Sequence, residues 1–498
     1  MKKLLLPLVL LFGCESDPRD PQTWIKKLSD PRESQNAISQ LKRLSDPVAV
    51  GPLIEHFKKT KDQEALRALA NFKDSRALPL FIEALSYTED TFDNAAMAAR
   101  ALAEIGDKSA VDPLIVALQK PLPIKSRANV VKLEVVKALG KTHDRRAAIA
   151  LGKVLVTPAD EQDFFLNHAA ANALAELGDE AAAPSLIRGL FMVGRGADLY
   201  PACRVALLSI GAPSVAPLIE ALQRKHPELE ADAKKYAYRP GVIVQKTAFV
   251  LGDLRDKSAV PALLAELARP AEGDSHRGVL FALGMIADPS TTKQIAAVMT
   301  NAKADFRERV SAAEALNLAG DAAALPLLLT TAQNGDILKD GQRYPDVRMA
   351  AALAYGRLGG AAEADAFAKL AASEKAIKPV TDEAATRLSV AKACKADVVC
   401  YEKELLAVDN NTLVRQEKAA FMLARLGKPA LPALLKKVNT PEPVVRFAVL
   451  YGIARTGDAS CAECKKALTD QIDIDRGKSN LAPLVDEMRA VIAELGHK

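Results

Sequence analysis

The chain has 498 residues, of which 49% are apolar but only 5% are aromatic, so alanine, leucine and valine must supply most of the core. Lysine and arginine number 67 against 62 acidic residues, a net charge of +5, which gives no support to a nucleic-acid-binding surface. Small residues favour closely packed helices, and no alternating strand pattern bounded by hairpin turns is visible. The composition therefore favours an all-α protein.

The first residues have the features of an export signal. Two lysines precede an apolar stretch at residues 4–12, which is too short to span a bilayer. The stretch ends in Leu-Phe-Gly-Cys14, which resembles the bacterial lipobox. This resemblance implies lipid transfer to Cys14 and cleavage before it. A cleaved secretory peptide with an incidental cysteine is the alternative.

Residues 1–13 are accordingly predicted to be a lipoprotein signal peptide and residues 14–23 a lipidated, flexible tether, because this segment is polar and contains two prolines. Acyl chains would hold the protein on a membrane without a transmembrane helix. We expect a bacterial cell-envelope protein, anchored to the inner or outer membrane and facing the periplasm or the surface. The sequence does not determine which membrane it is.

A phrase recurs with a period on the order of 34 residues along the rest of the chain. It reads Ala-Leu-Ala-Glu-Ile-Gly-Asp at 101–107, Ala-Leu-Ala-Glu-Leu-Gly-Asp at 173–179 and Val-Leu-Gly-Asp-Leu-Arg-Asp at 250–256. Such a period is typical of a solenoid, in which each unit is too small to bury its own apolar face. Each unit is predicted to contain a helix A, a short turn and a helix B.

Glycines and prolines set the expected boundaries of these helices. Helix A is expected to end at a glycine in the left-handed conformation, at Gly106, Gly140, Gly178, Gly211, Gly252, Gly427 and Gly457. Prolines are expected early in helix B, at Pro113, Pro184, Pro217, Pro261, Pro326 and Pro432. These markers predict about thirteen antiparallel helix pairs between Trp24 and Asp475, with a C-terminal capping helix at 480–495.

The repeats resemble the HEAT family, in particular the short variety first described in phycobilisome lyases. The resemblance covers residues 24–498 and implies an α-solenoid (superhelix), but no particular chemistry. It also implies ladders between neighbouring repeats, in which an arginine early in helix A pairs with an aspartate of the A–B turn. The candidates are Arg277, Arg348 and Arg446 with Asp107, Asp179, Asp321 and Asp458.

Three connections between repeats are long, at 193–201, 226–240 and 334–345, and each ends with a tyrosine near an arginine or proline. Insertions of this kind cluster on one edge of a solenoid, and tyrosine and arginine dominate protein interfaces. The candidate partner-binding residues are Arg195, Tyr200, Tyr238, Arg239, Arg343 and Tyr344. The alternative is that the tyrosines merely cover the ends of the core.

The remaining cysteines suggest two local disulfides, because an exported protein meets an oxidising compartment. Cys394 and Cys400 flank one A–B turn, and Cys461 and Cys464 form a Cys-x-x-Cys at the start of a helix B. The latter resembles the thioredoxin redox motif, but the strand–helix pattern of that family is missing, so a structural disulfide is favoured. Cys203 is expected to be a buried free thiol.

None of the six histidines is followed by glutamate, so the iron-binding His-Glu pairs of HEAT-type deoxyhypusine hydroxylases are missing. We therefore expect no catalytic residues, no cofactor and no metal. The favoured function is a non-catalytic protein-protein interaction scaffold or adaptor whose partner is an envelope protein or peptide. The alternative is an accessory to an envelope enzyme, a lyase-like or chaperone-like module that handles a cofactor or a polypeptide.

Overall fold

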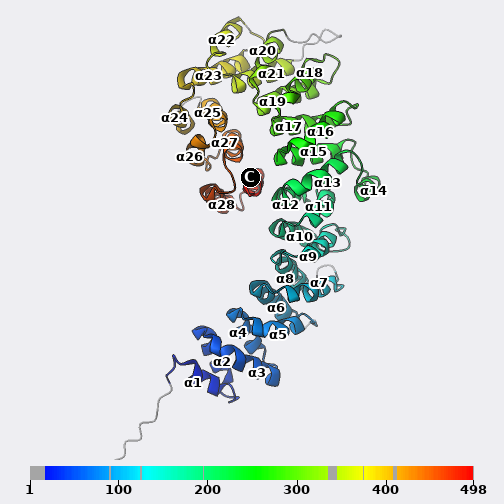
Figure 1. The fold of residues 1–498 in the computed structure, drawn as a ribbon, viewed down its shortest axis with the longest axis vertical. Coiled ribbons are helices and arrows are strands. Elements are labelled where there is room, and N and C mark those ends of the chain that lie inside the picture. Colours follow the sequence, from blue (N-terminus) through cyan, green and yellow to red (C-terminus); the bar gives the residue numbers. More distant parts are fainter. Residues whose placement is uncertain are drawn as a thin grey trace, which may run out of the picture. The chain divides into compact units, whose positions relative to one another are not determined.

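The computed structural model describes residues 17–88, 91–123, 126–194, 196–334, 345–373, 375–407 and 412–496. The predicted signal peptide and Cys14 lie outside the described residues. The described part of the chain is almost entirely helical (Figure 1). It contains thirteen A–B pairs, with α1 before them, α14 between the sixth and seventh, and α29 after the last. The predicted all-α solenoid is therefore confirmed.

The chain divides into two compact units. The first comprises residues 1–151 and 160–173, and the second comprises residues 152–159 and 174–498. The helices from the amino-terminal part are α1 (Pro21–Lys27), α2 (Ser34–Leu44), α3 (Val50–Thr60), α4 (Gln63–Phe72), α5 (Leu78–Ala84), α6 (Phe92–Ile105), α7 (Val111–Gln119), α8 (Asn129–Gly140), α9 (Arg145–Leu155) and α10 (Phe164–Leu177).

The next segment of the chain carries the two longer insertions that the structure describes. Its elements are α11 (Ala183–Gly189), β1 (Val193–Gly194), β2 (Ala197–Asp198), α12 (Tyr200–Ile210), α13 (Val215–Leu222), α14 (Pro227–Lys235), α15 (Val242–Leu254), α16 (Val260–Leu267), α17 (Ser275–Ile286), α18 (Thr292–Thr300), α19 (Phe306–Ala319) and α20 (Leu325–Asn334). The strands pair antiparallel, so the loop after α11 is a small hairpin.

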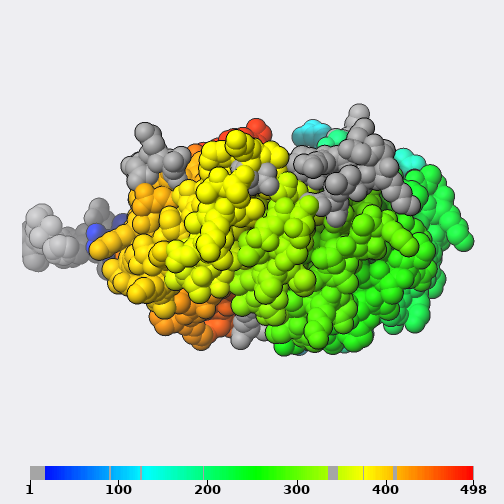
Figure 2. All heavy atoms as spheres, turned by 90° about the horizontal axis from the view of Figure 1, so that it is seen from above, coloured from blue at the N-terminus to red at the C-terminus, as the bar shows by residue number. Residues whose placement is uncertain are grey.

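The remaining helices complete the second unit. They are α21 (Pro345–Leu358), α22 (Ala364–Ser373), α23 (Lys378–Cys394), α24 (Val398–Leu406), α25 (Thr412–Leu426), α26 (Leu431–Leu435), α27 (Pro443–Thr456), α28 (Ala462–Asp475) and α29 (Ala482–Leu495). Neighbouring repeats in this region form a continuous surface of side chains, coloured green to orange (Figure 2).

Aspartate, rather than an arginine ladder, organises most A–B turns. A one-turn 3-10 helix precedes helix B, and an aspartate caps it: Asp107 Oδ1 accepts the Ser109 N–H at 2.8 Å, and Asp179 Oδ1 accepts the Ala181 N–H at 2.8 Å. Satisfying free N–H groups in this way is the usual role of a capping carboxylate. The 3-10 helices with an aspartate cap are Pro47–Ala49, Ser75–Ala77, Lys108–Ala110, Glu180–Ala182, Lys257–Ala259, Pro289–Thr291 and Ala322–Ala324. Three others have no side-chain cap: Ala212–Ser214, Lys428–Ala430 and, before α29, Ser479–Leu481.

The predicted arginine–aspartate ladder is wrong in its pairing. Arg446 donates to Asp475 at 2.6 Å, and that aspartate lies at the end of helix B of the same repeat, not in an A–B turn. Arg348 Nε donates to the Ala332 carbonyl at 3.0 Å. These arginines hold the preceding connection or their own helix B, while the turn aspartates are occupied by capping.

Only some of the marker glycines end helix A in the predicted way. Gly106, Gly178, Gly211 and Gly427 have a positive φ. Gly140 is the last residue of α8, and Gly457 follows the end of α27 with φ −79°, so helix A ends at both as predicted but without a left-handed glycine. Gly252 lies inside α15, and there the prediction is wrong. A Cβ on Gly140 would lie 2.9 Å from Ala173 Cβ, and one on Gly252 would lie 2.8 Å from Ala282 Cα. These two glycines are needed because successive A helices approach closely there.

The second unit closes on itself, because α29 packs against α12 and also against α27 and α28 (Figure 1). The core at this closure combines residues from distant repeats, including Met285, Leu318, Tyr451 and Val491. Tyr451 Oη donates to the Leu318 carbonyl at 2.9 Å. At this closure, α29 packs against α12, and Tyr451 of α27 contacts α19, so helices from the end of the chain lie against A helices of earlier repeats.

Candidate functional site

A cleft of about 740 Å³ lies at the amino-terminal ends of three successive A helices, α17, α19 and α21. Its walls include Asp274 and Arg277 beside and on α17, Phe306 and Glu308 in the first turn of α19, and Asp346 in the first turn of α21. The cleft spans three repeats, so its shape is fixed by how the A helices stack.

A second cavity of about 220 Å³ adjoins the cleft and is lined by Phe249, Arg277, Phe281, Ser311 and Glu314. Arg277, Ser311 and Glu314 line both hollows, so we treat the two together as one feature, the A-helix groove. The rings of Phe249 and Phe281 meet edge to face, with centroids 5.1 Å apart and an interplanar angle of 84°. The groove therefore joins an aromatic floor to a charged mouth.

Carboxylates outnumber cations in the cleft. The charged lining residues are Asp274, Asp305, Glu308, Glu314 and Asp346 against Arg277 and Arg307. Two of the carboxylates have structural partners: Asp305 Oδ1 accepts the Arg307 N–H at 2.9 Å, and Glu308 lies 3.3 Å from His276 Nδ1. Within the described part of the chain, Arg277 and Glu314 form no ion pair, and both are exposed.

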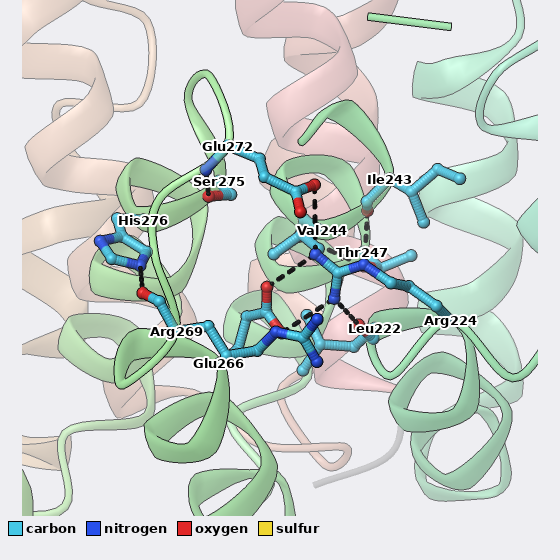
Figure 3. Close-up of polar contacts among 10 residues, drawn as sticks. All are labelled: Leu222, Arg224, Ile243, Val244, Thr247, Glu266, Arg269, Glu272, Ser275 and His276. Atoms are coloured by element: carbon cyan, nitrogen blue, oxygen red, sulfur yellow. Dashed lines mark hydrogen bonds and ion pairs between the residues drawn. The ribbon is translucent and has the colours of Figure 1, made fainter. Parts of the chain in front are cut away.

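An ion-pair network holds the α16–α17 connection, which carries Asp274 to the mouth of the cleft (Figure 3). Arg224 donates to both oxygens of Glu266, each at 3.0 Å, and to Glu272 at 3.3 Å. The hydrogen bond with Glu266 raises the pKa of the Arg224 guanidinium. Ser275 Oγ accepts the Glu272 N–H at 3.0 Å, and His276 Nε2 lies 3.0 Å from the Arg269 carbonyl. One wall of the groove is thus fixed in place before any partner binds.

Buried charges stabilise the closure of the second unit. Arg204 Nε donates to Asp253 at 2.7 Å, and its Nη1 donates to Glu487 of α29 at 2.8 Å. Arg255 Nη1 and Glu494 Oε1 form a second ion pair between α29 and the earlier repeats, at 3.4 Å. Burial raises the pKa of Asp253 to about 6, while Arg204 opposes this effect. Charges with so little access to water are costly unless they are paired, so this cluster depends on its partners.

The tyrosines predicted from the long loops pack against the solenoid. Tyr238 stacks on Phe191, with centroids 5.6 Å apart, and burial raises its pKa to about 12. Lys246 Nζ lies 5.0 Å from the centre of the Tyr200 ring and 5.4 Å from that of Phe191. Phe191 and Lys246 therefore bring Tyr200 and Tyr238 into one cluster.

Of the other predicted loop residues, Arg239 is exposed. Arg195, Arg343 and Tyr344 lie outside the described residues. The single edge strip of tyrosine and arginine therefore stays a prediction.

Disulfides join Cys394 to Cys400 and Cys461 to Cys464. Cys464 is fully buried in the core that includes α27 and α29. Cys203 is a buried free thiol, and burial raises its pKa. A buried sulfur at the Cys-x-x-Cys site is better suited to a structural disulfide than to thiol exchange, which requires access to a partner.

No three histidine, cysteine, aspartate or glutamate side chains within the described ranges are grouped so that they could hold a metal ion.

The described helices were also compared with the length and composition of a membrane span. No single helix among those the structure describes is long and apolar enough to span a bilayer; one bent pair, Tyr200–Ile210 with Ala212–Leu222, meets the criteria of length and composition, with a 117° bend.

The A-helix groove was not predicted from the sequence, although the sequence contains one signal of it. Arg277 and Phe281 are four residues apart on α17, as are Val310 and Glu314 on α19, so each pair lies on one helix face. Neither pair belongs to the recurring sequence that marks the A–B turns. Large side chains at these positions, on the side of helix A that faces away from helix B, are the signal from which the groove could have been predicted.

Two family models match the chain: one for HEAT repeats at residues 59–130 and one for PBS lyase HEAT-like repeats at residues 166–191. A curated deoxyhypusine hydroxylase from Cryptococcus neoformans var. neoformans is 25% identical over 232 residues, which is 43% of this chain and 62% of that protein. The match thus spans less than two thirds of this relative.

Solved structures with similar folds include human deoxyhypusine hydroxylase in complex with glycerol, with TM-score 0.22, 19% identity and coverage of 61% of this chain and 96% of that one. The complex of CpcE and CpcF of phycocyanin lyase from Nostoc has TM-score 0.20, 20% identity and coverage of 69% and 94%. A crystal structure of a Kap121p mutant has TM-score 0.43, 12% identity and coverage of 93% and 55%. None of these likenesses bears on function. The family models thus identify HEAT repeats at residues 59–130 and 166–191, and the thirteen A–B pairs of the described chain have the helix-pair architecture of such repeats.

Proposed function

We propose that this protein is a non-catalytic scaffold that holds a segment of another protein in the A-helix groove of its second unit. The observation that carries the proposal is the groove itself: an edge-to-face phenylalanine pair lines a cavity together with Arg277 and Glu314, two exposed charges that form no ion pair within the described chain. Aromatic and arginine side chains supply most of the binding energy in protein interfaces. The groove offers an apolar anchor site and charges that would orient the partner.

The rigidity of the groove supports a binding role. Arg224, Glu266 and Glu272 fix the α16–α17 connection, and His276 contacts Glu308 across to α19. A preformed site loses less conformational entropy when a partner binds. We propose that the groove needs little rearrangement to accept its partner.

The anchor completes the proposal. If Cys14 is lipidated, as its lipobox-like context implies, the solenoid is held at a membrane and its partner is an envelope protein or peptide. The alternative function is an accessory to an envelope enzyme, in which the same groove would hold a cofactor or a polypeptide in transit. The curated hydroxylase relative and the match to PBS lyase HEAT-like repeats motivate that alternative.

Site-specific photo-crosslinking in intact cells tests the proposal. A benzophenone amino acid replaces Val310, which lines the cleft, or Val399, which is 58% exposed on α24 and serves as the matched control. We expect one protein to crosslink at position 310 and not at position 399, as identified by mass spectrometry. No protein adduct at position 310, or the same adducts at both positions, would contradict a scaffold that uses this groove. A small molecule with its own absorbance in the purified protein would favour the alternative.

A further inference from the structure

We propose that the segment held in the A-helix groove is basic: an extended stretch of a partner protein that carries several lysines or arginines beside an apolar residue. This inference rests on the proposed function and names the chemistry of its partner. It follows from the charges in the groove, from the hydroxyl group of Ser311 in its wall and from the aromatic floor.

The charge balance of the cleft selects a cation. Five carboxylates and two arginines line it, and two of the carboxylates, Asp305 and Glu308, have roles in the fold. Asp274, Glu314 and Asp346 form no ion pair within the described chain, and they come from the ends or faces of three successive A helices. A hollow lined mainly by one sign of charge concentrates the opposite sign. An acidic segment would meet repulsion from all three.

The groove also contains a polar group that is ready to bind. Ser311 is 9% exposed, lines both cavities and makes no hydrogen bond within the described chain. The residue is largely buried, so its hydroxyl is held in place at the wall of the groove. It can accept a hydrogen bond from an ammonium, guanidinium or backbone N–H group that enters the groove.

The aromatic floor explains why the partner also needs an apolar residue. Phe249 and Phe281 are only partly buried, and Phe281 packs against the closure core. An apolar or cationic side chain above this ring pair would gain contact with aromatic faces, and cations favour such faces. The volume of the cleft, about 740 Å³, falls in the range of pockets that enclose a ligand. A short, extended peptide therefore matches the groove in both size and chemistry.

The test selects peptides from a random library displayed on phage, using the purified full chain as bait. A cleft variant combines Asp274→Asn, Glu314→Gln and Asp346→Asn. A control variant combines Asp382→Asn, Asp470→Asn and Asp473→Asn, three exposed carboxylates that form only local surface pairs. Both variants change the net charge equally, and circular dichroism establishes that both are folded.

We expect the wild-type chain to enrich peptides with an excess of lysine and arginine next to an apolar residue. By fluorescence anisotropy, the cleft variant should bind these peptides about tenfold more weakly, and the control variant should bind them as the wild type does. Enrichment of acidic or uncharged peptides, equal binding by the cleft and control variants, or no enrichment would overturn the inference. A partner that crosslinks at position 310 through an acidic segment would overturn it as well, while leaving the proposed scaffold function intact. If nothing crosslinks at position 310 but basic peptides bind as described, the scaffold function fails and the charge preference stands.

Discussion

Arg204 on α12 and Glu487 on α29 are 283 residues apart in the sequence, yet Arg204 Nη1 donates to Glu487 Oε2 at 2.8 Å. The same guanidinium donates through Nε to Asp253 on α15 at 2.7 Å. One side chain thus links α12 and α15, two successive A helices, to the last helix of the chain, α29. A solenoid is normally stabilised only by contacts between neighbouring repeats, so this closure adds a long-range constraint.

Replacing Arg204 should destabilise the second unit more than a substitution of an exposed residue does. Arg204→Ala leaves Asp253 buried without its cation, and we expect a loss of about 3–5 kcal/mol in the free energy of unfolding. Glu487→Gln keeps a hydrogen-bonding oxygen and should cost about 1 kcal/mol. Urea unfolding followed by circular dichroism measures both. Equal losses for the two variants would show that Asp253 does not depend on Arg204.

Asp253 should make the folded protein less stable as pH rises, whereas a carboxylate with a lowered pKa has the opposite effect. Burial raises its pKa in the folded protein to about 6, above the ordinary value of 3.8. The folded state therefore holds the proton more tightly, so the contribution of Asp253 to stability falls as pH rises between these two values. The Tm of the wild type minus that of Asp253→Asn should decrease from about pH 4 to about pH 7. A difference that grows with pH would show that the pKa is lowered instead.

Gly140 is predicted to be needed for the close contact of α8 with α10. In Gly140→Ala the new Cβ would lie 2.9 Å from Ala173 Cβ and 3.0 Å from its Cα, and we expect a loss of about 1–3 kcal/mol. Gly51→Ala in α3 is the control, because nothing lies within 4 Å of its Cβ; there, alanine should stabilise the helix by about 0.5–1 kcal/mol. Thermal unfolding of the two variants distinguishes them. A neutral Gly140→Ala would mean that the helices can move apart at no cost.

The Cys461–Cys464 disulfide is predicted to be structural. Replacing both cysteines with alanine should lower stability by about 2 kcal/mol, since the bond closes a short loop whose second sulfur is buried. The partners found by crosslinking at position 310 should not change. Loss of a measurable thiol–disulfide exchange activity, with unchanged stability, would instead favour the redox alternative.

Lipidation at Cys14 can be tested independently of the fold. We expect the wild-type chain to take up an alkyne-labelled fatty acid and to sediment with membranes, and Cys14→Ser to do neither. A serine variant that is still exported but labelled elsewhere would contradict Cys14 as the lipid site. Cys203→Ser is a suitable control, because that thiol is buried and unpaired.

The period, the helix pairs and the cysteine pairing could be predicted from the sequence because they depend on residues close together in the chain. Gly106 and Asp107 act within one turn, and their roles are local. Gly252 could not be distinguished from Gly106, because its reason, contact with Ala282, lies on another helix. The A-helix groove and the Arg204–Glu487 contact arise only when repeats stack and the chain curves back, and no short-range pattern encodes that curvature.

Amide hydrogen exchange of the full chain, with and without the partner captured by crosslinking, tests the central claim most directly. We predict slower exchange on binding in segments 273–281 and 305–314, which form the groove, and no change in segment 462–475 of α28. Protection confined to the loop segments that carry Tyr200, Tyr238 and Arg239 would contradict it and would favour the edge strip predicted from the sequence.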